Sequence, residues 1–108
     1  MTAAVPAPIQ AMIDATNRGD TKGFLDAFTE DALIDDWGRT FRGRAELASW
    51  NETDNIGKQA HFEVRGVEEG DGEYIVTLAV SGNGYNGTGP MHFRLAGDRI
   101  ASMIISSN

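Results

Sequence analysis

The chain contains no cysteine among its 108 residues. Disulfide bonds, a thiol nucleophile and a thiolate metal site are therefore excluded, and a reducing compartment is compatible with this composition. The first eight residues have neither a basic region nor the apolar run of a signal peptide. We therefore expect a cytoplasmic protein.

Basic residues are also scarce, with nine Lys and Arg against sixteen Asp and Glu and a formal net charge of −7. An acidic surface repels both nucleic acid and anionic membranes, so neither is an expected partner. No apolar run approaches the length of a membrane span. The only histidines, His61 and His92, lack the spacing of metal ligands, and we expect no metal and no cofactor.

The first half of the chain has helical periodicity. Residues 1–7 are expected to form a flexible arm, and residues 8–108 a single domain. Apolar side chains at helical spacing predict a first helix that begins at Pro8 and ends at Gly19. Asp20 or Thr21 then caps a short second helix, because these side chains can accept hydrogen bonds from free backbone N–H groups.

The remaining chain alternates in the way that strands do. We expect a strand over residues 32–37, a short extended piece or turn over 40–43, and a third helix over 44–52. Four further strands follow, and tight turns join them; the last runs from Arg99 to Ser106. This order, α-α-β-α-β-β-β-β, predicts an α+β fold with a mostly antiparallel sheet.

Eight short motifs occur in a fixed order along the chain. They are Asn17-x-Gly19-Asp20, Phe28-x-x-Asp31-Ala32, Asp36-Trp37-Gly38, Phe41-x-Gly43, a helix with Trp50, His92-Phe93-Arg94, Gly97-Asp98 and Ile100-x-x-Met103. Together they resemble the superfamily of nuclear transport factor 2, ketosteroid isomerase and the SnoaL-like polyketide cyclases. The resemblance implies a cone-like, curved sheet wrapped around three helices, an apolar pocket at one end, and a homodimer through the outer sheet face.

Asp36 is the candidate catalytic residue. Strand alternation places it on the same face as Ala32 and Ile34, and Asp35 on the opposite face. The resemblance points to the same position, because ketosteroid isomerase keeps its catalytic base near the end of the first strand. A carboxylate in an apolar pocket is suited to proton abstraction. The alternative is a structural carboxylate that pairs with a nearby arginine, and the candidates are Arg39, Arg42 and Arg44.

The resemblance also identifies a difference. In ketosteroid isomerase a tyrosine and a protonated aspartic acid form the oxyanion hole, and the matching positions here hold Met12 and Met91. Loss of one oxyanion-hole donor costs about 3 kcal/mol or more of transition-state stabilisation. A true ketosteroid isomerase is therefore not expected.

Apolar and aromatic side chains are the candidates for binding a substrate. The residues are Trp37, Trp50, Met12, Met91, Met103, Phe93 and Tyr85. For the methionines the alternative is ordinary core packing, since methionine fills irregular apolar space. Trp37 and Trp50 are equally compatible with core or interface positions.

These observations favour a pocket for a small hydrophobic ligand. The first hypothesis is a cofactor-free isomerase, cyclase or dehydratase that acts on a small hydrophobic carbonyl compound, with Asp36 as general base. Tyr85, Tyr74, Trp50 or an ordered water would then stabilise the oxyanion. The alternatives are a non-catalytic ligand-binding domain and a dimeric interaction domain of the same fold. A closed pocket in which Asp36 is buried and pairs with no arginine would favour the enzyme or the ligand-binding domain. A pocket filled by Met12, Met91, Met103 and Trp50 would favour the interaction domain.

Overall fold

The computed structural model describes residues 4–70 and 72–105. Its elements are α1 (Ala7–Asn17), α2 (Thr21–Asp26), β1 (Phe28–Asp36), β2 (Arg39–Arg42), α3 (Arg44–Asp54), the 3-10 turn η1 (Ile56–Lys58), β3 (His61–Gly70), β4 (Glu73–Ser81), β5 (Gly87–Ala96) and β6 (Arg99–Ile105). The predicted α+β class is confirmed. Part of the predicted arm, residues 1–3, and the predicted strand end at Ser106 lie outside the described residues.

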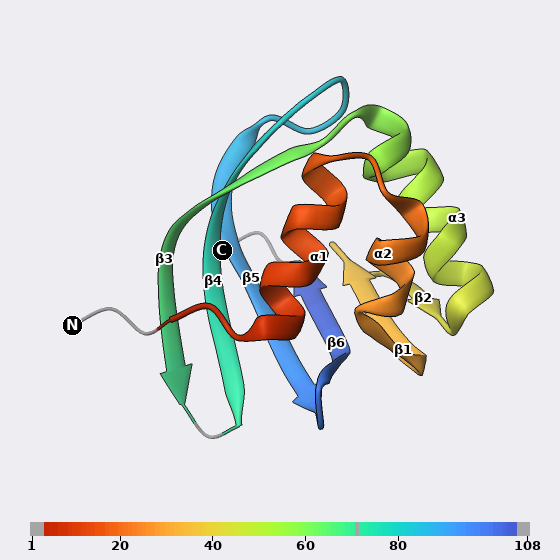
Figure 1. The fold of residues 1–108 in the computed structure, drawn as a ribbon. Helices are drawn as coiled ribbons and strands as arrows, with labels where there is room; N and C mark the ends of the chain where they lie inside the picture. Colours follow the sequence, from red (N-terminus) through yellow and green to blue (C-terminus); the bar gives the residue numbers. More distant parts are fainter. Residues whose placement is uncertain (1–3, 71, 106–108) are drawn as a thin grey trace.

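The six strands form one curved sheet in the order β2-β1-β6-β5-β4-β3 (Figure 1). Every neighbouring pair is antiparallel except β1 and β6, which are parallel. Figure 1 shows α1 and α2 in front of the sheet, with α3 beside the end that β1 and β2 form. The helices therefore cover one face, as the sequence predicts.

The first two strands differ most from the sequence prediction, whereas α1 ends two residues earlier than predicted, at Asn17, and α3 two residues later, at Asp54. The piece predicted as a turn or extended segment is the edge strand β2, which pairs with β1 from Leu33↔Arg42 to Asp36↔Arg39. Strand β1 begins at Phe28 rather than at residue 32, because Phe28 pairs with Ile100 of β6 across an irregularity. Pairing with a distant strand thus extends an element that alternation alone left short.

The core lies between the inner sheet face and the helices. The helical spacing predicts an inward face for each of the first two helices, and its residues are buried: Ile9, Met12, Ile13, Thr16, Phe24 and Leu25. Phe24 contacts Phe28 and Trp50 with ring centroids 5.0 and 6.0 Å apart. Asp20 is the N-cap of α2, and its carboxylate accepts a hydrogen bond from Gly23 N at 2.9 Å. Of the two predicted caps, Asp20 is therefore the one observed.

Candidate functional site

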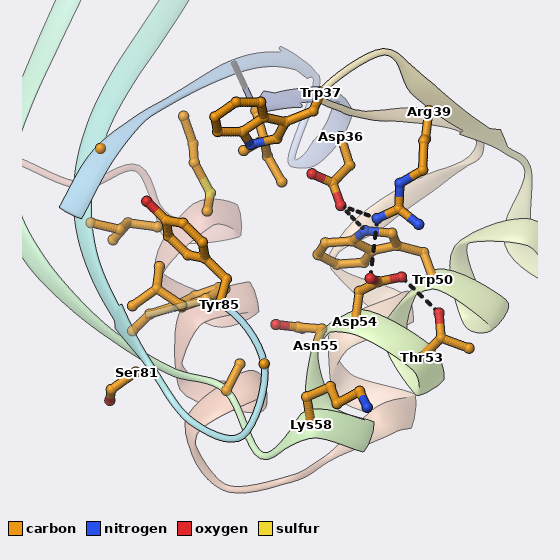
Figure 2. A pocket seen from close by; sticks show the side chains of 18 of the residues that line it. Asp36, Trp37, Arg39, Trp50, Thr53, Asp54, Asn55, Lys58, Ser81 and Tyr85 are labelled. Carbon is orange, nitrogen blue, oxygen red and sulfur yellow. Dashed lines mark hydrogen bonds and ion pairs between the residues drawn. The ribbon is translucent and has the colours of Figure 1, made fainter. Parts of the chain in front are cut away.

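A cavity of about 360 Å³ opens at one end of the inner sheet face (Figure 2). Its walls come from β1, the β1–β2 turn, α3 with η1, and the ends of β3 to β6. The lining residues are Asp36, Trp37, Arg39, Trp50, Thr53, Asp54, Asn55, Lys58, Ala60, Phe62, Leu78, Val80, Ser81, Gly84, Tyr85, Gly89, Pro90, Met91 and Ile105. Small-molecule pockets commonly measure roughly 300–1,000 Å³, so the cavity suits a small ligand.

Strand register explains which inner-face residues reach the cavity. Two neighbouring rows of side chains cross β1, β6 and β5. The cavity row is Asp36, Ile105 and Met91, and the core row is Ile34, Met103 and Phe93. All members of the cavity row line the cavity, and every member of the core row is completely buried. One step of two residues along each strand therefore separates the cavity from the core.

The predicted substrate-binding residues are divided between the cavity and the core. Trp37, Trp50, Met91 and Tyr85 are among the lining residues. The other three, Met12, Met103 and Phe93, are not, and they are completely buried in the core. Phe93 and Met103 belong to the core row, and Met12 lies on α1, so the alternative of core packing describes their position.

Asp36 holds its carboxylate in an asymmetric environment. Its Oδ2 accepts hydrogen bonds from Arg39 Nη2 at 2.6 Å and from Trp50 Nε1 at 3.0 Å. Among the described residues none donates to its Oδ1, and Figure 2 shows that oxygen on the cavity side. The side chain is only 16% exposed. One oxygen is thus held by the protein, and the other is available to a ligand.

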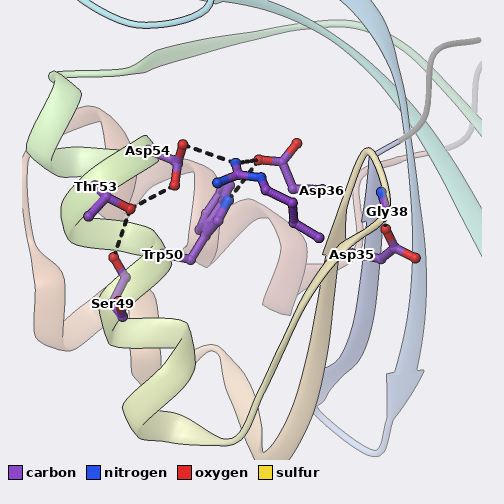
Figure 3. Close-up of polar contacts among 8 residues, drawn as sticks. Asp35, Asp36, Gly38, Ser49, Trp50, Thr53 and Asp54 are labelled. Carbon is purple, nitrogen blue, oxygen red and sulfur yellow. Dashed lines mark hydrogen bonds and ion pairs between the residues drawn. The ribbon is translucent and has the colours of Figure 1, made fainter.

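Arg39 connects the carboxylates of Asp36 and Asp54 at the edge of the cavity (Figure 2). Figure 3 shows both carboxylates and the contact between Thr53 and Asp54. The Nη2 atom of Arg39 also lies 3.1 Å from Asp54 Oδ1, and Thr53 Oγ1 donates to Asp54 Oδ2 at 2.7 Å. The hydrogen bond to Asp54, and then that to Asp36, raises the pKa of Arg39 above its ordinary value. The cation therefore persists, and the alternative of a carboxylate paired with arginine holds for Arg39.

The other acidic and basic groups of this segment lie elsewhere. Arg44 pairs with Asp26 at 2.9 Å, and Arg42 donates to the Asp31 carbonyl at 3.1 Å. Asp35 Oδ1 accepts a hydrogen bond from Gly38 N at 2.9 Å and is not among the lining residues. Alternation therefore separated Asp35 and Asp36 correctly.

Trp37 and Tyr85 are the two large hydrophobic residues described as exposed, at 60% and 59%, and both line the cavity. Trp37 and Gly38 form the two-residue turn between β1 and β2, with φ of 55° and 91°. Such hairpin turns require positive φ, which a bulky side chain adopts at a cost on the order of 1–3 kcal/mol. In Figure 2 the Tyr85 ring lies across the cavity from Trp50.

Sequence reasoning missed the contribution from the end of α3. The sequence predicts a third helix that ends at residue 52 and no role for the residues that follow, yet Asp54 and Asn55 line the cavity. Helical spacing from Trp50 was the available signal, because residues four apart lie on one helix face. The tertiary contact that turns this face toward β1 is not visible in the local sequence.

The histidines do not contribute to the site. His92 Nδ1 lies 3.1 Å from Glu73 Oε2, and neither histidine lines the cavity. Within residues 4–70 and 72–105 there is no group of three or more His, Cys, Asp or Glu side chains that could hold a metal ion. In the same part of the chain no helix has the length and apolarity needed to cross a membrane.

A sequence model of the SnoaL-like domain matches residues 9–103 of the chain. No match is found among the curated proteins. The family match runs from α1 into β6, and it includes the whole core row and, of the cavity row, Asp36 and Met91.

Several solved structures have the same fold. A protein from Sinorhizobium meliloti proposed to be a polyketide cyclase is 22% identical, with a TM-score of 0.84 over 93% of this chain and 94% of that one. Delta 5-3-ketosteroid isomerase from Mycobacterium sp. is 19% identical, with a TM-score of 0.81 and coverage of 94% and 91%. RV0760c from Mycobacterium tuberculosis, solved with estradiol-17beta-hemisuccinate, is 14% identical, with a TM-score of 0.79 and coverage of 94% and 91%. At these identities the likeness shows the fold alone.

Proposed function

The chain belongs to the SnoaL-like domain family, and on that premise we propose that it is a cofactor-free isomerase, cyclase or dehydratase for a small hydrophobic carbonyl compound. Asp36 acts as the general base. The observation that supports this role most directly is the asymmetry of its carboxylate, with Oδ2 bound by Arg39 and Trp50 and Oδ1 on the cavity side.

The proposed reaction begins with proton abstraction. Asp36 Oδ1 takes a proton from a carbon next to the ligand carbonyl, and the electron pair of that C–H bond moves to form an enolate. Where the ligand carries a β,γ double bond, this enolate is conjugated, and the protonated carboxyl returns the proton to the γ carbon, which moves the double bond and completes an isomerisation. The donors on Oδ2 keep the carboxylate oriented, and the apolar wall formed by Met91, Leu78 and Ile105 limits access of water.

The enolate oxygen needs a hydrogen-bond donor. Trp50 Nε1 already donates to Asp36, and Tyr74 OH donates to Glu69 at 3.3 Å outside the lining residues. Of the side chains proposed from the sequence, Tyr85 remains, and its ring faces the cavity (Figure 2). We assign it this role as part of the proposal.

A second candidate is a non-catalytic ligand-binding domain. The carboxylate of Asp36 already pairs with Arg39 at 2.6 Å, contrary to the unpaired carboxylate that the sequence criterion required, and such a pair can hold the cavity wall without taking part in a reaction. Both candidates agree on a small hydrophobic ligand. RV0760c, which shares the fold, was solved with a steroid ester.

We further propose a cytoplasmic homodimer in which the outer face of the sheet forms the interface. Ile75 and Ile104 flank His92 on that face, and both are only partly buried in the single chain. The absence of cysteine supports the cytoplasmic assignment. Sedimentation of the purified protein tests the dimer.

Hydrogen–deuterium exchange of a simple ketone tests the base. The protein is incubated with 2-tetralone in D₂O, and deuterium incorporation next to the carbonyl is followed by NMR. We expect faster exchange than in buffer, and a loss of about 100-fold or more of this acceleration in Asp36→Asn. Asp35→Asn is the matched control, because its carboxylate does not line the cavity. Acceleration that survives in Asp36→Asn would contradict the proposed base, and binding without acceleration would favour the non-catalytic alternative.

A further inference from the structure

A network of neutral polar side chains leads from the helices to the cavity. Asn55, which follows the last residue of α3, is only 1% exposed. Its Nδ2 donates to Thr16 Oγ1 at 3.1 Å and to Asn51 Oδ1 at 3.0 Å. Both amide protons are therefore used inside the protein.

The direction of the Asn55 amide follows from its neighbours. Asn51 Nδ2 is directed to Thr21 Oγ1 at 3.4 Å, so the oxygen of Asn51 faces Asn55 and requires a donor. The nitrogen of Asn55 supplies that donor, and it also donates to Thr16 Oγ1, whose own proton is directed to Met12 Sδ at 3.8 Å. The Oδ1 atom of Asn55 therefore points away from the network.

That oxygen faces the cavity. Asn55 is a lining residue, and Figure 2 shows its side chain pointing toward the middle of the cavity with the oxygen foremost. Among residues 4–70 and 72–105 no group donates a hydrogen bond to it. In the described part of the chain every fully buried side-chain N or O atom has a hydrogen-bond partner. Because Asn55 Oδ1 has none, this oxygen is not fully buried and is in contact with the open space of the cavity.

The chemistry of this oxygen differs from that of Asp36. It is neutral and accepts hydrogen bonds, and the network prevents the amide from turning to present a donor. A ligand hydroxyl or N–H group can satisfy it, whereas a carbonyl, ether or carboxylate oxygen cannot. An apolar group placed against it would leave a desolvated acceptor, and that is costly.

We propose that Asn55 is a specificity-determining residue, and that the ligand carries a hydroxyl or N–H donor directed to Asn55 Oδ1 in addition to its hydrophobic body. The inference rests on the proposed function, because it uses the same cavity. It adds the chemical class of the ligand, a hydroxylated or N–H-bearing hydrophobic compound. Catalysis at Asp36 is not required for it.

Two isosteric probes test the proposal. The affinity of 2-naphthol is compared with that of 2-fluoronaphthalene, which has similar size and no donor, by following the NMR signal of Trp50 Nε1–H at the cavity wall. We expect 2-naphthol to bind about tenfold or more tightly, since an unpaired buried acceptor disfavours the analogue. The side-chain ¹³Cγ signal of Asn55 should shift with 2-naphthol and stay in place with the fluoro analogue.

Variants separate the contribution of Asn55 from that of Asp36. The preference for 2-naphthol should disappear in Asn55→Ala and persist in Asp36→Asn. Asn51→Ala keeps Asn55 in place but removes the acceptor that orients its amide, so the preference should weaken there, whereas it should be unchanged in Asp35→Asn, whose carboxylate does not line the cavity. The ¹³Cγ measurement on the unaltered protein decides the question even if Asn55→Ala fails to fold.

Three outcomes would overturn the proposal. The first is equal affinity of the two probes, measured at Trp50. The second is a preference for 2-naphthol that is lost in Asp36→Asn and kept in Asn55→Ala. Either result would exclude the role of Asn55 and leave the ketone-exchange test of Asp36 unaffected. Failure of both probes to perturb Trp50 would exclude the ligand cavity itself, and the proposed function with it. Loss of ketone exchange alone would leave the role of Asn55 intact.

Discussion

The core row and the cavity row differ in what lies above them. Both rows cross the same three strands, and both are largely apolar, yet Ile34, Met103 and Phe93 are completely buried while Ile105, Met91 and Asp36 border open space. Helices cover the first row, and α3 with the loop after β4 surrounds the second. Two residues further along each strand, the side chains are no longer covered in the same way. They therefore border the cavity and do not belong to the core.

The two rows also differ in their polar side chains. The core row is purely apolar, and Asp36 is the charged member of the cavity row. Arg39, Asp54 and Asn55 join it from α3 and β2 rather than from the central strands. The sheet supplies the apolar wall, and the elements at its edge supply the polar groups.

The largest expected effect distinguishes the two rows by stability. Phe93→Ala should lower the free energy of unfolding by about 3–5 kcal/mol, because it leaves a cavity in a packed core. Met91→Ala on the same strand should cost clearly less, since one side of Met91 already borders open space. Urea denaturation of both variants measures the difference. Equal losses would mean that the two rows are packed alike.

A smaller effect is expected where the cavity meets solvent. Tyr85→Ala should change the free energy of unfolding by less than about 0.5 kcal/mol, because the ring is exposed. It should weaken binding of 2-naphthol, since the ring forms part of the wall. A Tyr85→Ala variant that binds the probe unchanged would remove Tyr85 from the site.

Gly87→Ala should displace the Tyr85 ring without removing it. A Cβ atom at Gly87 would lie 2.5 Å from Tyr85 OH, so the tyrosine must rotate away. Gly66→Ala on β3 is the control, because nothing lies within 4 Å of the added atom and Gly66 is not a lining residue. Calorimetric titration with 2-naphthol should show weaker binding in Gly87→Ala alone.

The smallest effect concerns Asp20, the N-cap of α2. The hydrogen bond from Gly23 N, and then the one from Arg18, lowers the pKa of Asp20 below its ordinary value of 3.8. A carboxyl whose pKa is lower in the folded state stabilises the protein above that ordinary value and loses this contribution as the pH falls through the folded-state pKa. Asp20→Asn should therefore slightly lower the melting temperature near pH 7 and reduce its decline in acid. Thermal unfolding between pH 7 and pH 2 measures both; identical curves would contradict this role of the cap.

Local sequence patterns predicted much of the fold. Helical spacing located the inward residues of α1 and α2, and the cap at Asp20 and the end at Gly19 followed from side-chain chemistry and positive φ. Alternation distinguished Asp36 from Asp35. These features depend on neighbours within a few residues, so a single sequence contains them.

The partners of Asp36 could be predicted only in part. Arg39 was one of three arginines considered, and it is three residues away across a tight turn. Trp50 was considered as a lining residue and not as a donor to Asp36. That contact joins residues 14 apart, and it depends on how α3 packs against β1.

The sequence alone determined the order of the elements, the faces of the helices and strands, and the presence of a carboxylate on an apolar face. Only the tertiary structure decided which apolar row is covered and which borders the cavity, since Phe93 and Met91 have the same local pattern. It also decided that Asn55 turns its oxygen into that cavity. The physical reason is that burial and hydrogen-bond pairing arise between elements far apart in the chain, where local periodicity carries no information.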